Sequence, residues 1–202
     1  MNKIKAIIFD ADGMVIRNTK RFSLRYQEKY GITNEEMLPF FEGVFKKCEI
    51  GQADLREEIK PYLKKWKWDK SINELLQFWF EAEKDIDERI VNLIKKLKKR
   101  GIGCYLMTNN EKYRTEYLRK EAGFDKIFDY VFSSAYMGCM KPEKKCFNLL
   151  CKGIDIEKSE ILFCDDDQKN IKGIEDYGFE AHHYKGYNKF LELLNNKYKL
   201  NL

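Results

Sequence analysis

The sequence contains no apolar run that approaches the roughly 20 residues a transmembrane helix needs. The first residues, MNKIKAIIFDADG, hold only a short apolar stretch that ends in acids, and they lack the long apolar core and cleavage site of a signal peptide. Internal repeats and low-complexity tracts are also missing. We therefore expect a soluble, cytoplasmic, globular protein that does not have a membrane as its partner.

A strong excess of one charge is missing as well. The 38 Lys and Arg residues face 33 Asp and Glu residues, a formal net charge of +5, which falls short of the basic stripe of a nucleic-acid-binding protein. The most basic stretch, KKWKWDK at 64–70, interleaves two Trp residues with lysines. We interpret it as a solvated helix end with inward-packed Trp residues, with nucleic-acid binding as the weaker alternative. The composition leaves the oligomeric state open.

None of the 6 cysteines belongs to a Cys-x-x-Cys pair, so a zinc site is not expected. Cys104 and Cys164 lie inside apolar runs, where cysteine behaves as a small hydrophobic residue. Because no secretion signal precedes them, we expect all of these thiols to be reduced.

What the sequence does contain is a regular alternation of short apolar runs and amphipathic stretches. The apolar runs are at 4–10, 102–108, 130–134, 160–165 and 180–184, and their nearly continuous apolar character is typical of strands buried on both faces. Helical patterns occupy 86–101, 111–123, 142–153 and 168–178. This alternation predicts an α/β fold, a doubly wound, Rossmann-like parallel sheet with helices on both faces.

Residues 17–85 break the alternation, because they carry only helical patterns. The segment is too long for a loop in a compact domain, so we predict a small all-helical domain inserted after the first strand. The predicted domains are a catalytic core at 1–16 and 86–202 and a helical cap at 17–85. We interpret the aromatic residues of the cap as its core rather than as a substrate-binding surface: Phe40, Phe41, Phe45, Trp66, Trp68, Phe78, Trp79 and Phe80.

Polar residues follow four of the predicted strands at the point where each strand ends. In an open parallel sheet, ligands bind beyond these carboxyl ends. The residues are Asp10 and Asp12 after the first strand, Thr108, Asn109 and Asn110 after the second, Lys141 after the third, and Asp165, Asp166 and Asp167 after the fourth. Carboxylates, a hydroxyl, amides and an amine are thus expected to converge on one edge.

Four short motifs, DADG, MTNN, MKPEKK and FCDDDQKN, occur in this order and position. In this respect the sequence resembles the haloacid dehalogenase superfamily, and specifically its phosphatase members with a helical cap. The resemblance covers about 1–16 and 86–185. The sequence departs from the family after DADG, where it has Met14, Val15, Arg17 and Asn18 in place of the residues often found there. Arg17 and Asn18 fall at the start of the cap, where the resemblance implies that substrates are selected.

The resemblance implies that Asp10 is a nucleophile that forms an aspartyl phosphate. Asp12 would be the general acid and base, and its backbone carbonyl would reach a metal ion. Thr108 would donate a hydrogen bond to the phosphoryl group, and the backbone N–H groups of Asn109 and Asn110 would add donors. Lys141 would offset the negative charge of the phosphoryl group and of Asp10.

The same resemblance implies a Mg²⁺ site formed by Asp10, Asp165 and Asp166. One acid of the pair Asp165 and Asp166 would bind directly and the other through water, and Asp166 is favoured as the direct ligand. Asp167 is expected to cap the following helix, and Asn170 to support the site from behind.

The predicted function is that of a magnesium-dependent phosphomonoesterase acting on a small phosphorylated metabolite, with sugar phosphates as one candidate class. Two alternatives remain: a phosphomutase of the same superfamily, and a non-catalytic phosphoryl-binding or regulatory protein. Dehalogenation is disfavoured by Asp12, because similar dehalogenases lack an acid at that position.

Overall fold

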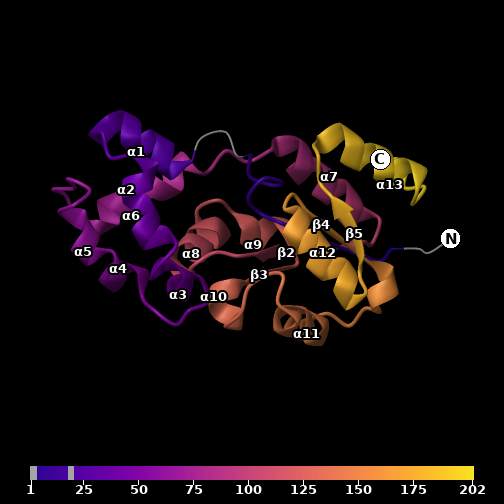
Figure 1. Cartoon of the computed structure of the whole chain (residues 1–202). Helices are drawn as coiled ribbons and strands as arrows, with labels where there is room; N and C mark the ends of the chain where they lie inside the picture. Colours follow the sequence, from indigo (N-terminus) through magenta and orange to yellow (C-terminus); the bar gives the residue numbers. More distant parts are fainter. Residues whose placement is uncertain (1–3, 18–20) are drawn as a thin grey trace.

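A single five-stranded parallel sheet forms the centre of the protein (Figure 1). The structure, a computed structural model, describes residues 4–17 and 21–202. The strands are β1 (Ala6–Phe9), β2 (Gly103–Thr108), β3 (Tyr130–Ser133), β4 (Ile161–Asp165) and β5 (Glu180–His183). Their order is β3-β2-β1-β4-β5, so β1 lies in the middle. All five predicted strands are confirmed, and the reversal of strand order beside β1 is where such sheets bind ligands.

The two faces of β1 enter two different hydrophobic clusters. Ile7 and Phe9 belong to one cluster, and Ala6 and Ile8 belong to the other. Successive side chains of a strand point to opposite faces, so a strand covered on both sides must be apolar throughout. All four side chains are fully buried, which explains the uninterrupted apolar run in the sequence.

Helices cover both faces of the sheet, as the α/β prediction requires. The first cluster receives residues of α7 (Glu88–Lys99), α8 (Lys112–Lys120), α9 (Phe124–Ile127) and α13 (Tyr187–Asn196). The second cluster receives residues of α11 (Lys144–Gly153) and α12 (Gln168–Tyr177). Two short elements, α10 (Ser134–Met137) and the 3-10 helix Lys158–Glu160, complete this part of the chain. Helices α9, α10 and α13 were not anticipated from the sequence.

The segment between β1 and α7 forms a group of helices beside the carboxyl end of the sheet, here called the helical module (Figure 1). It consists of α1 (Phe22–Tyr30), α2 (Asn34–Phe41), α3 (Phe45–Glu49), α4 (Leu55–Glu58), α5 (Lys60–Leu63) and α6 (Ile72–Ala82). Its own hydrophobic cluster contains Tyr26, Phe40 and Trp66. Trp66 and Trp68 are 1% and 7% exposed, so both pack inward as interpreted from the basic stretch.

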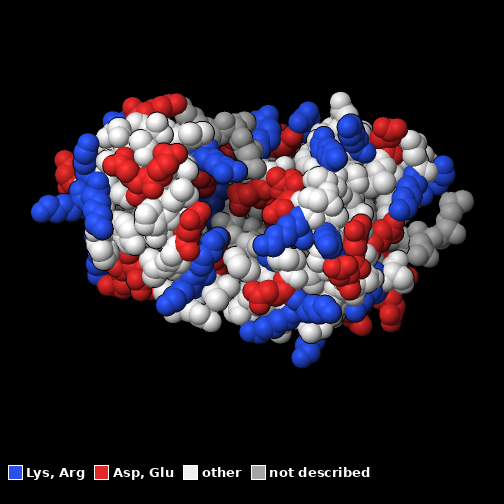
Figure 2. Space-filling view, in the orientation of Figure 1, with Lys and Arg blue, Asp and Glu red and all other residues white. Residues whose placement is uncertain are grey.

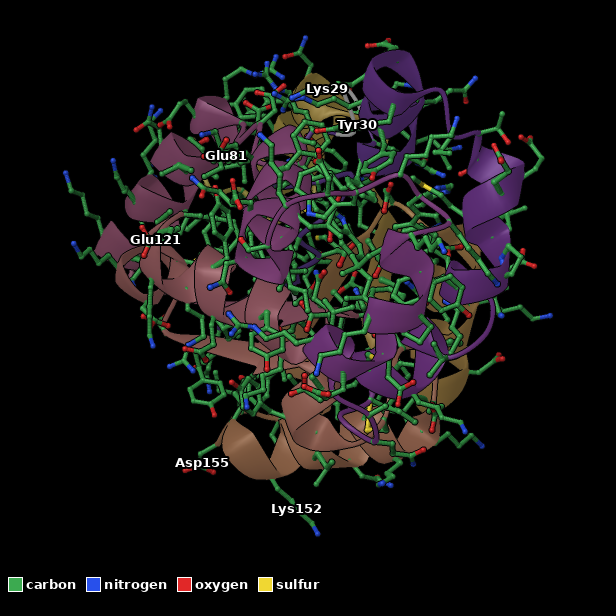
Figure 3. The ribbon with its side chains drawn as sticks, turned by 90° about the vertical axis from the view of Figure 1, so that its left-hand side faces the viewer. Lys29, Tyr30, Glu81, Glu121, Lys152 and Asp155 are labelled. Atoms are coloured by element: carbon green, nitrogen blue, oxygen red, sulfur yellow. A yellow bond between two sulfur atoms is a disulfide. The ribbon has the colours of Figure 1, made fainter. Side chains whose placement is uncertain are left out.

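Two neighbouring chain segments connect the helical module to the sheet. Ile16 and Ile86 pair in an antiparallel bridge, and the Arg17 backbone N–H donates to the Asp85 carbonyl at 2.8 Å. Arg17 and Asp85 also form an ion pair through their side chains. Viewed from the helical module, Lys29 of α1 lies near the top and Lys152 of α11 at the bottom (Figure 3). In the described part of the chain, no helix has the length and apolar character needed to cross a bilayer.

Cys139 and Cys146 form a disulfide, so the expectation of six reduced thiols is wrong for this pair. The loop after α10 approaches the first turn of α11 and places the two Cα atoms 5.7 Å apart, within the range that a disulfide can bridge. Cys48, Cys104, Cys151 and Cys164 are free thiols.

Candidate active site

The amine of Lys141 joins two carboxylates that lie at the ends of neighbouring strands. Its Nζ donates to Asp10 Oδ1 and to Asp165 Oδ2, at 2.6 Å in each case. Asp10 follows β1, Asp165 ends β4, and Lys141 lies beyond β3. Their side chains are 10%, 0% and 1% exposed, respectively. Because unpaired charges are costly to bury, this arrangement holds Asp10 in one place and orientation.

Asp165 is fixed on every side. Both of its carboxylate oxygens accept from Asn170 Nδ2 at 3.1 Å, and Oδ1 also accepts from the Asp167 backbone N–H at 2.9 Å. The side chain of Asp167 caps α12 by accepting from the Lys169 backbone N–H. The structure thus places Asn170 behind the site and Asp167 at the helix start.

The carboxylate of Asp166 lies against Gly13, in the loop that follows β1. A Cβ atom added to Gly13 would lie 1.8 Å from Asp166 Oδ2, and Gly13 has a φ of +90°. Both the space and the backbone conformation therefore require glycine. The DADG sequence thus brings Asp12 past the sheet edge while leaving room for the Asp166 carboxylate, which is half-buried. His183 supports this segment, since its Nε2 lies 3.0 Å from the Asp166 carbonyl oxygen.

Asn110 connects Asp12 to Thr108. Its Nδ2 lies 2.9 Å from Asp12 Oδ2 and 2.6 Å from Thr108 Oγ1. Its backbone carbonyl accepts from the hydroxyls of Ser133 at 2.9 Å and Ser134 at 3.2 Å. Thr108 is buried, whereas the Asp12 side chain is 41% exposed, so Asp12 is accessible to a ligand at the sheet edge.

Asn109 holds the backbone of Lys141. Its Oδ1 accepts from the Lys141 backbone N–H at 2.8 Å, and its Nδ2 donates to the Lys141 carbonyl at 3.0 Å. The resemblance implied a backbone donor to substrate at Asn109. The structure shows in addition that its side chain positions the lysine.

Arg114 of α8 was not identified from the sequence, although it touches the site. It is 4% exposed, and its NH2 lies 3.7 Å from Asp12 Oδ1. The guanidinium also donates to the carbonyl of Phe80, at 3.0 Å, and to that of Glu83. Those carbonyls belong to the end of α6 and the residue after it, so Arg114 joins Asp12 to the helical module.

The buried charges change one another's proton affinity. Burial raises the pKa of Asp10 to about 8, against the attraction of Lys141, and repulsion from Asp165 adds to the increase. Burial by itself lowers the pKa of Lys141, but its attraction to Asp10 and Asp165 outweighs burial and makes the net shift upward. Burial and the neighbouring Asp165 raise the pKa of Asp166.

Asp10, Asp165 and Asp166 are the described residues whose arrangement suits a metal ion. One ligand oxygen from each lies within 4.8 Å of the others. Oxygen donors of this kind suit Mg²⁺, which binds to one or two carboxylates and keeps several waters. A divalent cation would also offset the excess of carboxylates over the single Lys141 amine. The residues therefore fit the magnesium site that the sequence predicts.

Arg17, one of the two predicted specificity residues, lies at the connection to the helical module, where it pairs with Asp85. It does not line the cavity described next. Asn18 lies outside the described residues.

A cavity of about 300 Å³ lies between the helical module and the sheet edge. Acidic side chains gather beside the hollow between these two parts of the molecule (Figure 2). The lining includes Asn109, Asn110 and Arg114 from the site and Phe41, Phe45 and Trp79 from the helical module. The last three had been interpreted as core residues only, and the structure shows that they also face a cavity.

Comparisons with known proteins agree with this geometry. The family model of haloacid dehalogenase-like hydrolases matches residues 4–178. A sesquiterpene phosphatase of Aspergillus oryzae is 31% identical over 97 residues, which are 48% of this chain and 50% of the fungal protein. Bifunctional epoxide hydrolase 2 of Sus scrofa is 26% identical over 152 residues, which are 73% of this chain and 25% of the pig protein. The chain thus spans half or less of the curated relatives it matches.

A crystal structure of a haloacid dehalogenase family enzyme of Bacteroides thetaiotaomicron, in complex with magnesium and inorganic phosphate, has a TM-score of 0.78 and 21% identity. The match covers 90% of this chain and 94% of the bacterial one. This likeness shows a common fold. Together with the family model, which covers strands β1 to β4 and the motifs that follow them, it identifies the chain as a member of the haloacid dehalogenase-like hydrolases.

Proposed function

We propose that this hydrolase is a magnesium-dependent phosphomonoesterase that acts through an aspartyl phosphate. The observation that carries the proposal is Lys141, whose amine bridges Asp10 and Asp165 at 2.6 Å each, beside the three-carboxylate cluster. The fungal relative named as a phosphatase and the bacterial structure with magnesium and phosphate support the same chemistry.

In the first step, an Asp10 carboxylate oxygen attacks phosphorus, the bond from phosphorus to the ester oxygen breaks, and Asp12 protonates that oxygen. In the second step, Asp12 removes a proton from a water molecule, which attacks the aspartyl phosphate and releases inorganic phosphate and the Asp10 carboxylate. The exposed Asp12 carboxylate and the fixed Asp10 carboxylate suit these two tasks.

Thr108 and Lys141 would hold the phosphoryl oxygens. Asp10, Asp165, Asp166 and the Asp12 carbonyl would hold Mg²⁺, which when bound stabilises negative charge on the phosphoryl group. The helical module would act as the cap, with the domain boundaries near 17 and 85, because its cavity opens beside Asn110 and Arg114.

Release of inorganic phosphate from p-nitrophenyl phosphate tests the proposal. The parent protein should hydrolyse this ester with Mg²⁺ and lose the activity in excess chelator, and Asp10→Asn should be inactive. Asp155→Asn is the matched control, because Asp155 is exposed near the end of α11, away from the site (Figure 3). Hydrolysis that survives chelation, or that Asp10→Asn retains, contradicts the proposal.

A further inference from the structure

We infer that the leaving group of the substrate is an uncharged, apolar chain or ring that occupies the 300 Å³ cavity between the helical module and the sheet edge. This inference rests on the proposed phosphatase function and names the class of ester on which it acts. Sugar phosphates, the class suggested by sequence, carry several hydroxyls and are the competing class.

The apolar side of the cavity is a continuous aromatic surface. The rings of Phe41 and Phe45 each lie 5.4 Å, centroid to centroid, from the ring of Trp79. Phe22 stacks on Trp79 at 4.9 Å, and Leu38 also lines the cavity. Such a surface binds apolar groups by removing them from water.

The acidic side chains of the cavity already have partners within the protein. Glu83 accepts from the Phe22 backbone N–H at 2.8 Å through one oxygen and from Trp79 Nε1 at 3.1 Å through the other. Glu111 accepts from two backbone N–H groups at the start of α8, and Glu49 pairs with Lys46 at 2.8 Å. These bonds leave fewer acceptor positions on the carboxylates for a sugar hydroxyl.

The amide and guanidinium groups are occupied in the same way. Asn109 holds the Lys141 backbone, Asn110 holds Asp12 and Thr108, and Arg114 holds two carbonyls of the helical module. Arg21, Ser23 and Asn34 are the polar lining residues for which the described part of the chain provides no side-chain partner. A polyhydroxylated group needs more hydrogen-bonding positions than these, because unmatched buried hydroxyls are unfavourable.

The charge of the cavity disfavours an anionic leaving group. Three acids, Glu49, Glu83 and Glu111, line it against two arginines, Arg21 and Arg114. The guanidinium of Arg114 is already next to Asp12. A second phosphate or a carboxylate on the substrate would face these three acids. The leaving group that fits is therefore neutral as well as apolar.

The test compares ethyl, butyl, hexyl and octyl phosphate, below their micelle concentrations, with glucose 6-phosphate. Burial of each added methylene should raise kcat/KM roughly threefold to fourfold until the cavity is filled, giving at least a hundredfold from ethyl to octyl. Glucose 6-phosphate should stay within tenfold of ethyl phosphate. A flat series, or a glucose 6-phosphate value above that of octyl phosphate, overturns the inference while leaving the phosphatase function intact.

Phe45→Ala should lower the octyl-to-ethyl ratio of kcat/KM at least fivefold. Phe78→Ala is the matched control, since Phe78 is a half-buried aromatic residue of the same module that does not line the cavity, and it should keep the parent ratio. An equal fall of the ratio in both variants counts against the inference.

Binding of alkylphosphonates of the same chain lengths, with Mg²⁺ and measured by calorimetry, separates the two proposals. If no ester is hydrolysed but affinity rises with chain length, the proposed function fails and takes the leaving-group assignment with it, while the cavity is still shown to bind an apolar chain. If affinity does not depend on chain length, the inference fails.

Discussion

Arg114 and Asp12 face each other across 3.7 Å, although one belongs to helix α8 and the other to the loop after β1. The same guanidinium is hydrogen-bonded to the carbonyls of Phe80 and Glu83. One buried side chain thus connects the proposed acid and base to the module that encloses the cavity. We infer that Arg114 is a positioning residue, which keeps Asp12 aligned with the helical module.

Arg114→Lys should retain the positive charge but lose the pair of hydrogen bonds to the two carbonyls. An ammonium group does not have the two parallel N–H donors of a planar guanidinium. We expect kcat/KM for butyl phosphate, whose leaving group needs a proton, to fall about 10- to 100-fold. The fall for p-nitrophenyl phosphate should be clearly smaller. Arg119→Lys, a more exposed change on the same helix, is the control. Equal losses with both esters would assign Arg114 a structural role only.

Asp166 and Asp167 are adjacent but should respond differently to substitution. Asp166→Ala removes a carboxylate of the three-acid cluster, whereas Asp167→Ala removes a helix cap, which typically destabilises a protein by ~1 kcal/mol. Asp166→Ala should therefore weaken Mg²⁺ binding and abolish most activity, and Asp167→Ala should mainly lower Tm. Titration of Mg²⁺ by calorimetry, together with thermal unfolding, measures both effects. Similar Mg²⁺ affinities in the two variants would contradict the assignment of Asp166.

Mg²⁺ binding should strengthen as pH rises. Burial raises the pKa of Asp10 to about 8 in the metal-free protein, so below this pH the carboxyl is protonated and the metal must displace the proton. The apparent affinity should increase by up to about tenfold per pH unit from about pH 6 to 8 and level off above pH 8. Calorimetry in two buffers of different ionisation enthalpy measures the proton released. An affinity that does not change between pH 6 and 8 would show that Asp10 is already ionised there.

The strands could be located from the sequence because burial on both faces leaves a local signal, as the alternating clusters of Ile7 and Ile8 show. The residues at the strand ends were found for a similar reason. Parallel strands carry Asp10 and Asp165 to one edge, so the convergence of these two residues follows from topology. Lys141 comes after α10 and is held at this edge by the side chain of Asn109.

The contacts that the sequence did not reveal depend on tertiary packing. Arg114 is an ordinary helix residue in sequence, and only the docking of α6 against α8 gives it carbonyl partners. Phe45 and Trp79 belong to an aromatic-rich module, and sequence cannot show which rings face a cavity. Helix α9, which spans only Phe124–Ile127, is too short to produce a periodic pattern.

The cysteine pair gives a further test of the fold around Lys141. Cys139 and Cys146 flank this residue and are bonded to each other. Unfolded, unreduced protein should therefore take up alkylating reagent on four of its six cysteines, and on all six after reduction. In the folded protein Cys151 should react first, because burial raises the pKa of Cys48 and Cys104 to about 12. Mass spectrometry counts the adducts, and six adducts without reductant would show that the disulfide is absent.

In the proposed mechanism, Asp10 as nucleophile and Asp12 as general acid and base have different chemical roles, which pre-steady-state hydrolysis of p-nitrophenyl phosphate by Asp12→Asn can separate. Nitrophenolate leaves without a proton, so phosphorylation of Asp10 should proceed, whereas the second step lacks its base and should slow by about 10²- to 10⁴-fold. We predict a burst close to one equivalent of nitrophenolate, followed by slow turnover, and no burst in Asp10→Asn. Steady release at the parent rate, without a burst, would show that Asp12 is not the general acid and base.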